Sequence, residues 1–164
     1  MQRRKPLRLK GYDYGQNNAY FVTVCVRDRS CIFWRPDAQS GRTMFAPTPA
    51  DTLSDVGLMV DACVRAIPMV YAHIQAVHYA IMPNHVHLLL LFDDASVGAV
   101  TDRPPANLSR VVKQFKGAAS KKAGTPLWQK GFYETVVRSE RQLLDIWQYI
   151  TENPHKWQDD EYFT

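Results

Sequence analysis

Residues 81–90, Ile-Met-Pro-Asn-His-Val-His-Leu-Leu-Leu, place two histidines two positions apart in a run that is otherwise mostly apolar. Side chains alternate between the faces of a strand, so His85 and His87 are expected on one face, with Val86 and Leu88 on the other. Two imidazoles side by side on a sheet form half of a metal site. A single histidine in such a strand is commonly a hydrogen-bonded core residue, whereas a pair must desolvate two rings together. This stretch alone leaves both interpretations open, and the metal interpretation requires rings that solvent can reach.

The composition of the 164 residues is typical of one globular domain, with 46% hydrophobic and 22% charged residues. We expect a single domain over residues 1–164, in which residues 1–15 form a basic N-terminal arm. The three cysteines form no C-x-x-C pair, so nothing indicates a disulfide framework or a zinc knuckle. No apolar run is long enough to span a bilayer and none follows the basic start. We therefore expect a cytoplasmic, nucleoid-associated protein without a membrane partner.

Basic residues are segregated from acidic ones, although the net charge of +4 is modest. Residues 2–10 contain no acid, a second basic cluster lies within residues 110–122, and acids gather at 93–94 and 159–161. This pattern suits a polyanionic partner, although charged clusters are also common on ordinary solvated surfaces. If the partner is DNA, the candidate phosphate contacts are Arg3, Arg4, Arg110, Lys113, Lys116, Lys121 and Lys122.

The predicted secondary structure is a mixture of strands and helices. β-Branched and aromatic residues between turn signals predict strands over residues 19–27, 74–81, 85–92 and 131–137. Apolar residues at helical spacing, together with capping residues, predict helices over residues 53–71, 107–122 and from Ser139 to Pro154. Met82-Pro83-Asn84 is a turn that pairs the two middle strands as a hairpin. The order predicts an α+β protein with a sheet on one side and helices on the other.

The last predicted helix carries a tyrosine away from its apolar side. That side is expected to hold Leu143, Leu144, Trp147 and Ile150. Tyr149 lies off it, one turn before Asn153. A phenol is a nucleophile when a metal or a base helps to remove its proton, so this residue and the histidine pair together suggest attack on a phosphodiester. Asn153 is either an oxygen ligand, which favours Mg or Mn over zinc, or a helix C-cap before Pro154.

Tyr133, which precedes Glu134, is the rival nucleophile. The alternating pattern of residues 132–137 explains this tyrosine as an ordinary strand residue. We therefore favour Tyr149.

Two segments resemble the paired motifs of the single-tyrosine HUH transposases, and of the REP-associated tyrosine transposases in particular: residues 83–87, Pro-Asn-His-Val-His, and residues 149–154, Tyr-Ile-Thr-Glu-Asn-Pro. Residues 9–14, 19–23, 127–134 and 153–157 are similar to a subgroup of that family. The resemblance implies a ferredoxin-like α+β domain whose helices pack on one side of an antiparallel sheet. This chain has Thr135 at a position where many relatives carry a histidine. That difference bears on substrate handling or rate more than on reaction type.

The resemblance also implies a reaction and a set of roles. His85 and His87 would hold a divalent metal, Mg or Mn, with Asn153 as the third ligand. Tyr149 would attack the scissile phosphate of single-stranded or hairpin DNA and leave a 5′-phosphotyrosine and a free 3′-hydroxyl. The protein would act as a monomer or a homodimer.

Two other functions are compatible with parts of this pattern. One is a DNA-hairpin-binding protein without cleavage activity, which the presence of His85, His87 and Tyr149 disfavours. The other is a histidine-triad nucleotide hydrolase, which would need a further histidine where the chain has Leu89.

Overall fold

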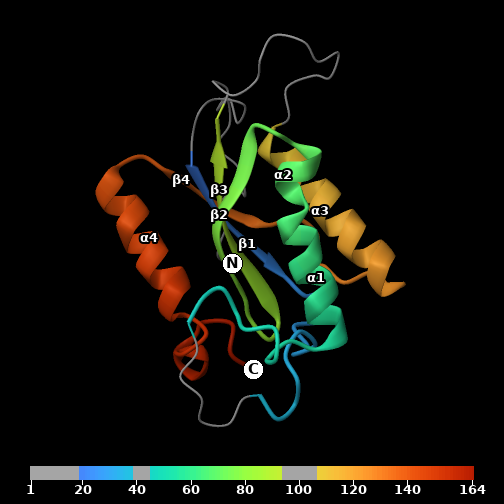
Figure 1. Ribbon diagram of the computed structural model, residues 1–164. Helices are drawn as coiled ribbons and strands as arrows, with labels where there is room; N and C mark the ends of the chain where they lie inside the picture. The colour runs from blue at the N-terminus through green and yellow to red at the C-terminus, as the bar shows by residue number, and fades with distance from the viewer. Residues whose placement is uncertain (1–18, 39–44, 94–106) are drawn as a thin grey trace, which may run out of the picture.

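The computed structural model describes residues 19–38, 45–93 and 107–164, and it shows a four-stranded antiparallel sheet with helices on both faces (Figure 1). The strands follow the order β2-β3-β1-β4 across the sheet. Their bounds are β1 Ala19–Cys25, β2 Ile74–Ile81, β3 His85–Phe92 and β4 Tyr133–Val137. Helices join β1 to β2 and β3 to β4, and a hairpin joins β2 to β3, which is the ferredoxin-like arrangement. The predicted α+β class with an antiparallel sheet is confirmed.

The helices are α1 Asp55–Arg65, α2 Ile67–Val70, α3 Leu108–Ala123 and α4 Glu140–Glu152, and a short 3-10 helix follows at Trp157–Asp159. The helix predicted over residues 53–71 is divided at Ala66, because Pro68 lies in the first turn of α2 and lacks the N–H that would continue α1. The predicted N-caps are present. Asn107 accepts from the backbone N–H of Arg110, and Ser139 accepts from that of Gln142.

The prediction that the helices share one side of the sheet is wrong. α1 and α3 cover one face, whereas α4 lies on the other (Figure 1). Neighbouring residues of β2 show the division: the Tyr79 hydroxyl donates to Asp61 of α1, and His78 stacks on Trp147 of α4 with ring centroids 4.2 Å apart. The second face carries the histidines, and α4 packs there through a ring contact that helical spacing alone does not reveal.

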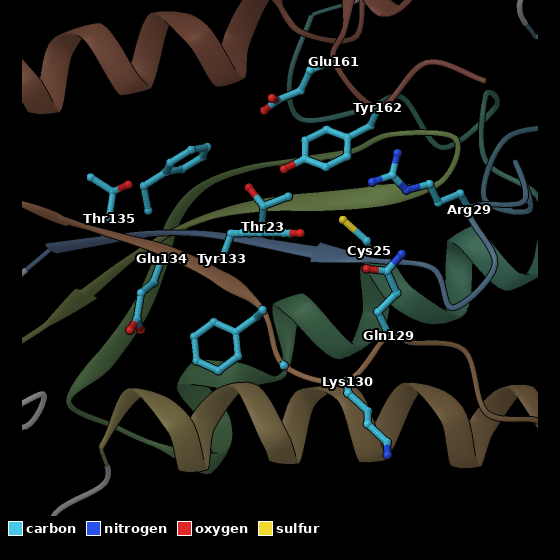
Figure 2. A pocket seen from close by; sticks show the side chains of 13 residues that line it. Thr23, Cys25, Arg29, Gln129, Lys130, Tyr133, Glu134, Thr135, Glu161 and Tyr162 are labelled. Carbon is cyan, nitrogen blue, oxygen red and sulfur yellow. The ribbon is translucent and has the colours of Figure 1, made fainter. Parts of the chain in front are cut away.

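The apolar side predicted for α4 is only partly buried. Ile150 is inaccessible, whereas Leu144 is 62% exposed and Trp147 is half-exposed. α4 contacts the two outer strands of the sheet, β2 and β4. A pocket remains on this face over parts of β1 and β4, and Thr23 and Tyr133 line it (Figure 2).

The N-terminal arm, with Arg3 and Arg4, lies outside the described residues. Among the described residues, no helix combines the length and the apolar character that crossing a bilayer demands.

Candidate functional site

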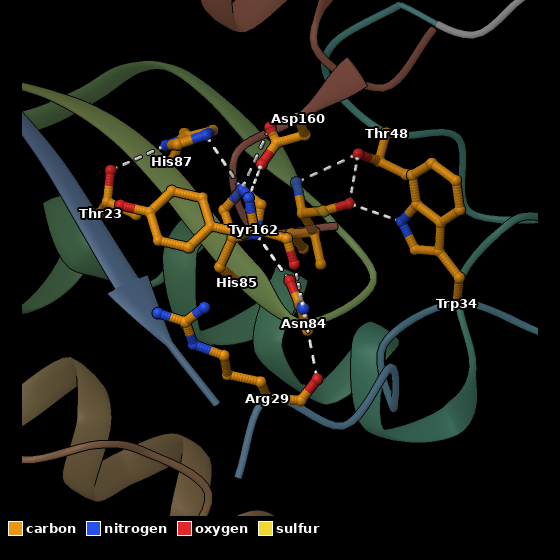
Figure 3. Close-up of polar contacts among 10 residues, drawn as sticks. Thr23, Arg29, Trp34, Thr48, Asn84, His85, His87, Asp160 and Tyr162 are labelled. Atoms are coloured by element: carbon orange, nitrogen blue, oxygen red, sulfur yellow. Dashed lines mark hydrogen bonds and ion pairs between the residues drawn. The ribbon is translucent and has the colours of Figure 1, made fainter. Parts of the chain in front are cut away.

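The turn between β2 and β3 is held from several directions. The backbone N–H groups of Val26 and Phe33 donate to the carbonyls of Asn84 and Pro83, at 2.9 and 3.0 Å. At the end of β2, the Ile81 carbonyl accepts from the Trp34 indole at 2.7 Å and from the Thr48 hydroxyl at 2.8 Å (Figure 3). The start of β3, and therefore the position of its histidines, is fixed by this network.

His85 and His87 project from the same face of β3, as the alternation predicts, and their Nε2 atoms lie 3.0 Å apart. Asn84 Nδ2 donates to the carbonyls of Arg29 and Tyr162, so its Oδ1 faces His85 and accepts from His85 Nδ1 at 2.8 Å (Figure 3). In a neutral ring this leaves a lone pair on His85 Nε2. Thr23 Oγ1 bonds His87 Nδ1 at 2.9 Å and orients the second ring. Either a proton or a cation must therefore lie between the two Nε2 atoms.

Both imidazoles are kept neutral by burial. Burial, with smaller contributions from His87 and Arg29, holds the pKa of His85 well below its usual range. Burial lowers the pKa of His87 to about 3. Neutral imidazole is the form that binds a metal ion.

The expectation that solvent reaches the two rings is wrong, because His85 is 0% and His87 1% exposed. The C-terminal segment covers them. The Tyr162 ring lies 4.6 Å from that of His85, between ring centroids, and Asp160 Oδ2 lies 3.8 Å from His85 Nε2. The C-terminal segment therefore places the Asp160 carboxylate next to the two histidines.

The donor atoms that converge here fit a divalent cation. His85, His87 and Asp160 each offer one ligand atom, all within 4.8 Å of one another. Asp160 Oδ2 and Asn153 Oδ1 are buried and accept no hydrogen bond. The 3.0 Å between the two Nε2 atoms is close enough for both imidazoles to hold one ion. Two imidazole nitrogens and a carboxylate oxygen form a mixed nitrogen and oxygen donor set of the kind that binds divalent metal ions.

Tyr149 lies beside the histidines in the same chain. Its ring centroid is 5.3 Å from that of His87 and 5.9 Å from that of Phe21 on β1. The side chain is 41% exposed. Burial and then the charge of Asp160 raise the pKa of Tyr149, and a hydrogen bond with Asn153 opposes that rise.

Asn153 has the cap role that the sequence left open, while its role as a metal ligand stays a prediction. It is the C-cap residue of α4, where its N–H donates to the Tyr149 carbonyl at 3.0 Å. Burial raises the pKa of both Tyr149 and Asp160, and hydrogen bonding from the buried Asn153 side chain opposes that rise in each. Its amide therefore links the phenol to the carboxylate beside the histidines.

The basic residues of α3 lie on the opposite layer of the molecule from the histidines (Figure 1). Lys116 is engaged within the fold, since its Nζ donates to the carbonyls of Gln129 and Gly131 at 2.7 and 2.8 Å. The remaining members of this group are exposed: Arg110, Lys113, Lys121 and Lys122.

Three residues at the site were not predicted from the sequence: Arg29, Asp160 and Tyr162. Arg29 has a left-handed backbone, with φ of 61°, and its guanidinium carbon lies 5.8 Å from the centre of the Tyr162 ring. Asp160 belongs to the acidic tail that the charge pattern treats as solvated surface. Nothing in its spacing from the histidines indicates contact, so only the path of the chain after Pro154 could reveal it.

Comparison with known proteins agrees with this architecture. The family model described as IS200-like transposase matches residues 65–153. An uncharacterized protein of Haemophilus influenzae is 28% identical over 98% of this chain and 93% of its own length. A second protein of that organism, provisionally named a REP-associated tyrosine transposase, is 20% identical over 88% of this chain and 74% of its own length.

Among solved structures, a REP-associated tyrosine transposase bound to a REP hairpin matches 92% of this chain and 73% of its own, with a TM-score of 0.60 and 17% identity. That likeness shows the shared fold. The family model spans more than half of the chain and includes the two histidines and the tyrosine helix. The resemblance to tyrosine transposases is thereby confirmed, and the chain belongs to the IS200-like transposase family.

Proposed function

We propose that this protein is a metal-dependent endonuclease and strand transferase that acts on single-stranded DNA at hairpins, with Tyr149 as its nucleophile. The observation that carries the proposal is the 5.3 Å separation between the Tyr149 and His87 rings, next to two Nε2 atoms 3.0 Å apart. Family membership supports a transposase. The hairpin in the related structure supports this choice of substrate.

In the proposed reaction the Tyr149 oxygen attacks the scissile phosphorus. The new P–O bond forms as the bond to the 3′ oxygen breaks, so the strand ends in a 3′-hydroxyl and the other product is a 5′-phosphotyrosine. The phenol proton passes to solvent, and the leaving oxygen takes up a proton. Attack of a 3′-hydroxyl on the phosphotyrosine reverses these bonds and joins strands. Bound by His85 and His87 with an oxygen of Asn153 or Asp160, Mg or Mn would supply positive charge for the phosphate.

The protein's own groups have distinct tasks in this scheme. Asn153 stabilises the phenolate through its hydrogen bond, whereas the charge of Asp160 disfavours it. Neutralising Asp160 would therefore activate Tyr149. Thr23 and Asn84 orient the imidazoles through their Nδ1 atoms.

A second candidate is a DNA-hairpin-binding protein without cleavage activity. The burial of both imidazoles beneath Asp160 and Tyr162 favours it, because a phosphate must reach these rings before cleavage. The two candidates agree on the substrate and differ on the covalent step.

The covalent step is tested by incubating end-labelled hairpin DNA with a single-stranded flank and Mg or Mn, followed by denaturing electrophoresis. Wild type is expected to give a protein-linked DNA band that Tyr149→Phe abolishes, because the nucleophile is lost. Tyr133→Phe is the matched control and should keep the band. Hairpin binding by Tyr149→Phe should stay close to wild type, because the substitution removes one oxygen and keeps the ring.

Two results would contradict the proposal. A band with Tyr149→Phe but not with Tyr133→Phe would assign the nucleophile to Tyr133. Hairpin binding without any band from wild type, with either metal, would favour the binding protein.

A further inference from the structure

A pocket of about 710 Å³ opens on the sheet face beside the histidines (Figure 2). Its floor is formed by alternate residues of β1 and β4, including Phe21, Thr23 and Tyr133. Its walls are the loop around Gln129 and the C-terminal Tyr162. No residue of α4 lines the pocket, so the side chains of the floor face open space.

The pocket is continuous with the site already described. Phe21 lines it and also packs edge-on against Tyr149, with 5.9 Å between ring centroids. Thr23 lines it and bonds His87. A molecule in this pocket therefore lies next to the phenol and the imidazoles.

Aromatic side chains give the pocket surfaces on which a flat ring can stack. Tyr133 is 49% exposed, and its ring centroid lies 6.4 Å from that of Tyr162. Exposed aromatic rings in a groove are the common means by which proteins hold unpaired bases, because every base has a flat face.

Arg29 supplies a positive charge at the same place, with its guanidinium directed toward the Tyr162 ring (Figure 2). Within the described residues, no carboxylate forms an ion pair with it. Its left-handed backbone is stabilised by Asn84 Nδ2, which donates to the Arg29 carbonyl at 3.2 Å. Such a conformation is unusual for a residue with a side chain and persists where surrounding contacts enforce it. The turn that orients His85 therefore also positions this cation.

Lys116 of α3 holds the loop around Gln129 that forms one wall of the pocket. Its ammonium holds the carbonyls of Gln129 and Gly131, and Gly131 has a φ of 75°. The Gln129 N–H also donates to the Cys25 carbonyl at 2.9 Å. The wall is thus tied both to α3 and to β1, which indicates a preformed pocket.

We propose that this pocket binds one unpaired nucleotide adjacent to the scissile phosphate, with Tyr133 stacking on its base and Arg29 pairing with its phosphate. The proposal rests on the proposed function for the presence of single-stranded DNA, and it does not depend on cleavage. Tyr133 thereby gains a role in substrate binding, distinct from that of Tyr149.

The test measures binding without chemistry, using Tyr149→Phe as the parent and no divalent cation. The probe is a fluorescent hairpin with a single-stranded flank, in which each flank nucleotide in turn is made abasic. We expect one abasic position to raise the Kd by roughly 5- to 150-fold, the effect of losing one stacked base. Tyr133→Leu should raise the Kd of the intact probe by a similar factor and abolish the effect of that abasic position. Tyr133→Phe, which keeps the ring, should behave as the parent.

Arg29→Asn tests the cation while retaining a residue that tolerates the left-handed backbone. It should lower the slope of log Kd against log salt concentration by about one unit. Phe45→Leu is the control, because Phe45 is an exposed aromatic residue that does not line the pocket. It should bind as the parent does.

The proposal would be overturned if Tyr133→Leu bound the intact probe as tightly as the parent does. It would also be overturned if Tyr133→Leu and the abasic position weakened binding independently, so that their effects on the binding free energy added. If those results accompany a covalent adduct in wild type, the pocket assignment alone is wrong. If the parent binds no hairpin, the proposed function fails as well. If the effects of Tyr133 and of one base are coupled but wild type forms no covalent adduct, the pocket assignment stands and the proposed cleavage activity is wrong.

Discussion

α3 and α4 lie on opposite faces of one sheet and differ in how they pack. α3 buries five residues along its length, namely Leu108, Val111, Val112, Phe115 and Ala119. α4 buries only Ile150 within its bounds, although it is also amphipathic and has a serine N-cap. Helical periodicity is therefore similar in the two, while the surface that each meets is different. The difference indicates that α3 stabilises the fold and α4 presents side chains.

The surfaces beneath the two helices explain this contrast. Under α3 and α1 the strands contribute inaccessible apolar side chains such as Val22 and Leu88. On the α4 face lie the imidazoles of His78, His85 and His87, together with buried oxygens of Asn153 and Asp160 that accept no hydrogen bond. A buried polar atom without a partner costs about 1–3 kcal/mol, so this face gives up stability where a cation would restore it.

The largest expected effect tests the packing contrast directly. Phe115→Ala on α3 should lower the free energy of unfolding by about 3–5 kcal/mol, because it leaves a cavity against Trp128. Leu144→Ala on α4 should change it by less than about 0.5 kcal/mol, because that side chain is largely exposed. Urea denaturation measures both, and comparable losses would contradict the contrast.

Metal binding should restore stability to the α4 face. A free Mn concentration of about 100 times Kd should stabilise the protein by about 2.7 kcal/mol, which raises the Tm by roughly 5–11 °C. Asp160→Asn should reduce this gain while leaving the metal-free protein at least as stable, since it removes a buried charge. Asp159→Asn is the matched control, because its carboxylate is on an exposed residue. Equal losses of metal stabilisation in both variants would argue against Asp160 as a ligand.

The metal-free protein should lose stability in acid through its buried histidines. The folded-state pKa of His87 is about 3, so between about pH 6.5 and 3 the unfolded chain binds a proton that the native ring does not. The free energy of unfolding should fall in this window by up to about 1.4 kcal/mol per pH unit for this ring. His85 acts in the same direction, whereas Asp160, whose pKa is raised by burial, acts in the opposite one.

Urea titrations across this pH range, with a chelator present, measure that slope. His87→Gln should reduce it, because the depressed pKa of the buried ring is removed. An unchanged slope in His87→Gln would show that His87 is protonated alike in both states.

The smallest expected effect concerns the salt dependence of DNA binding. Helical spacing alone assigns both Lys113 and Lys116 to phosphate contacts, but Lys116 is occupied by two carbonyls. Lys113→Ala should lower the slope of log Kd against log salt by about one unit. Lys116→Met should leave the slope nearly unchanged. A shift for Lys116→Met as large as for Lys113→Ala would show that its ammonium reaches DNA.

Local patterns were enough to predict most of the helices and strands. The alternation of His85 and His87, the Ser139 cap and the β2–β3 hairpin all follow from contacts between near neighbours in the chain. The side of the sheet that a helix occupies depends on contacts between residues distant in the sequence, such as the stacking of His78 on Trp147. For that reason the prediction that all helices lie on one side of the sheet was wrong. The roles of Tyr149, Asn153 and the histidines as ligands and nucleophile stay predictions.

The sequence by itself determined the family, the order of the elements and the pairing of two histidines on one strand, because spacing within a strand or helix fixes which side chains share a face. Only the tertiary structure decided that Tyr149 lies beside His87, that Lys116 holds a loop and that Asp160 covers the histidines. These contacts join residues separated along the chain, so they depend on how the sheet is covered and on the path of the chain beyond α4. No local periodicity encodes such a path.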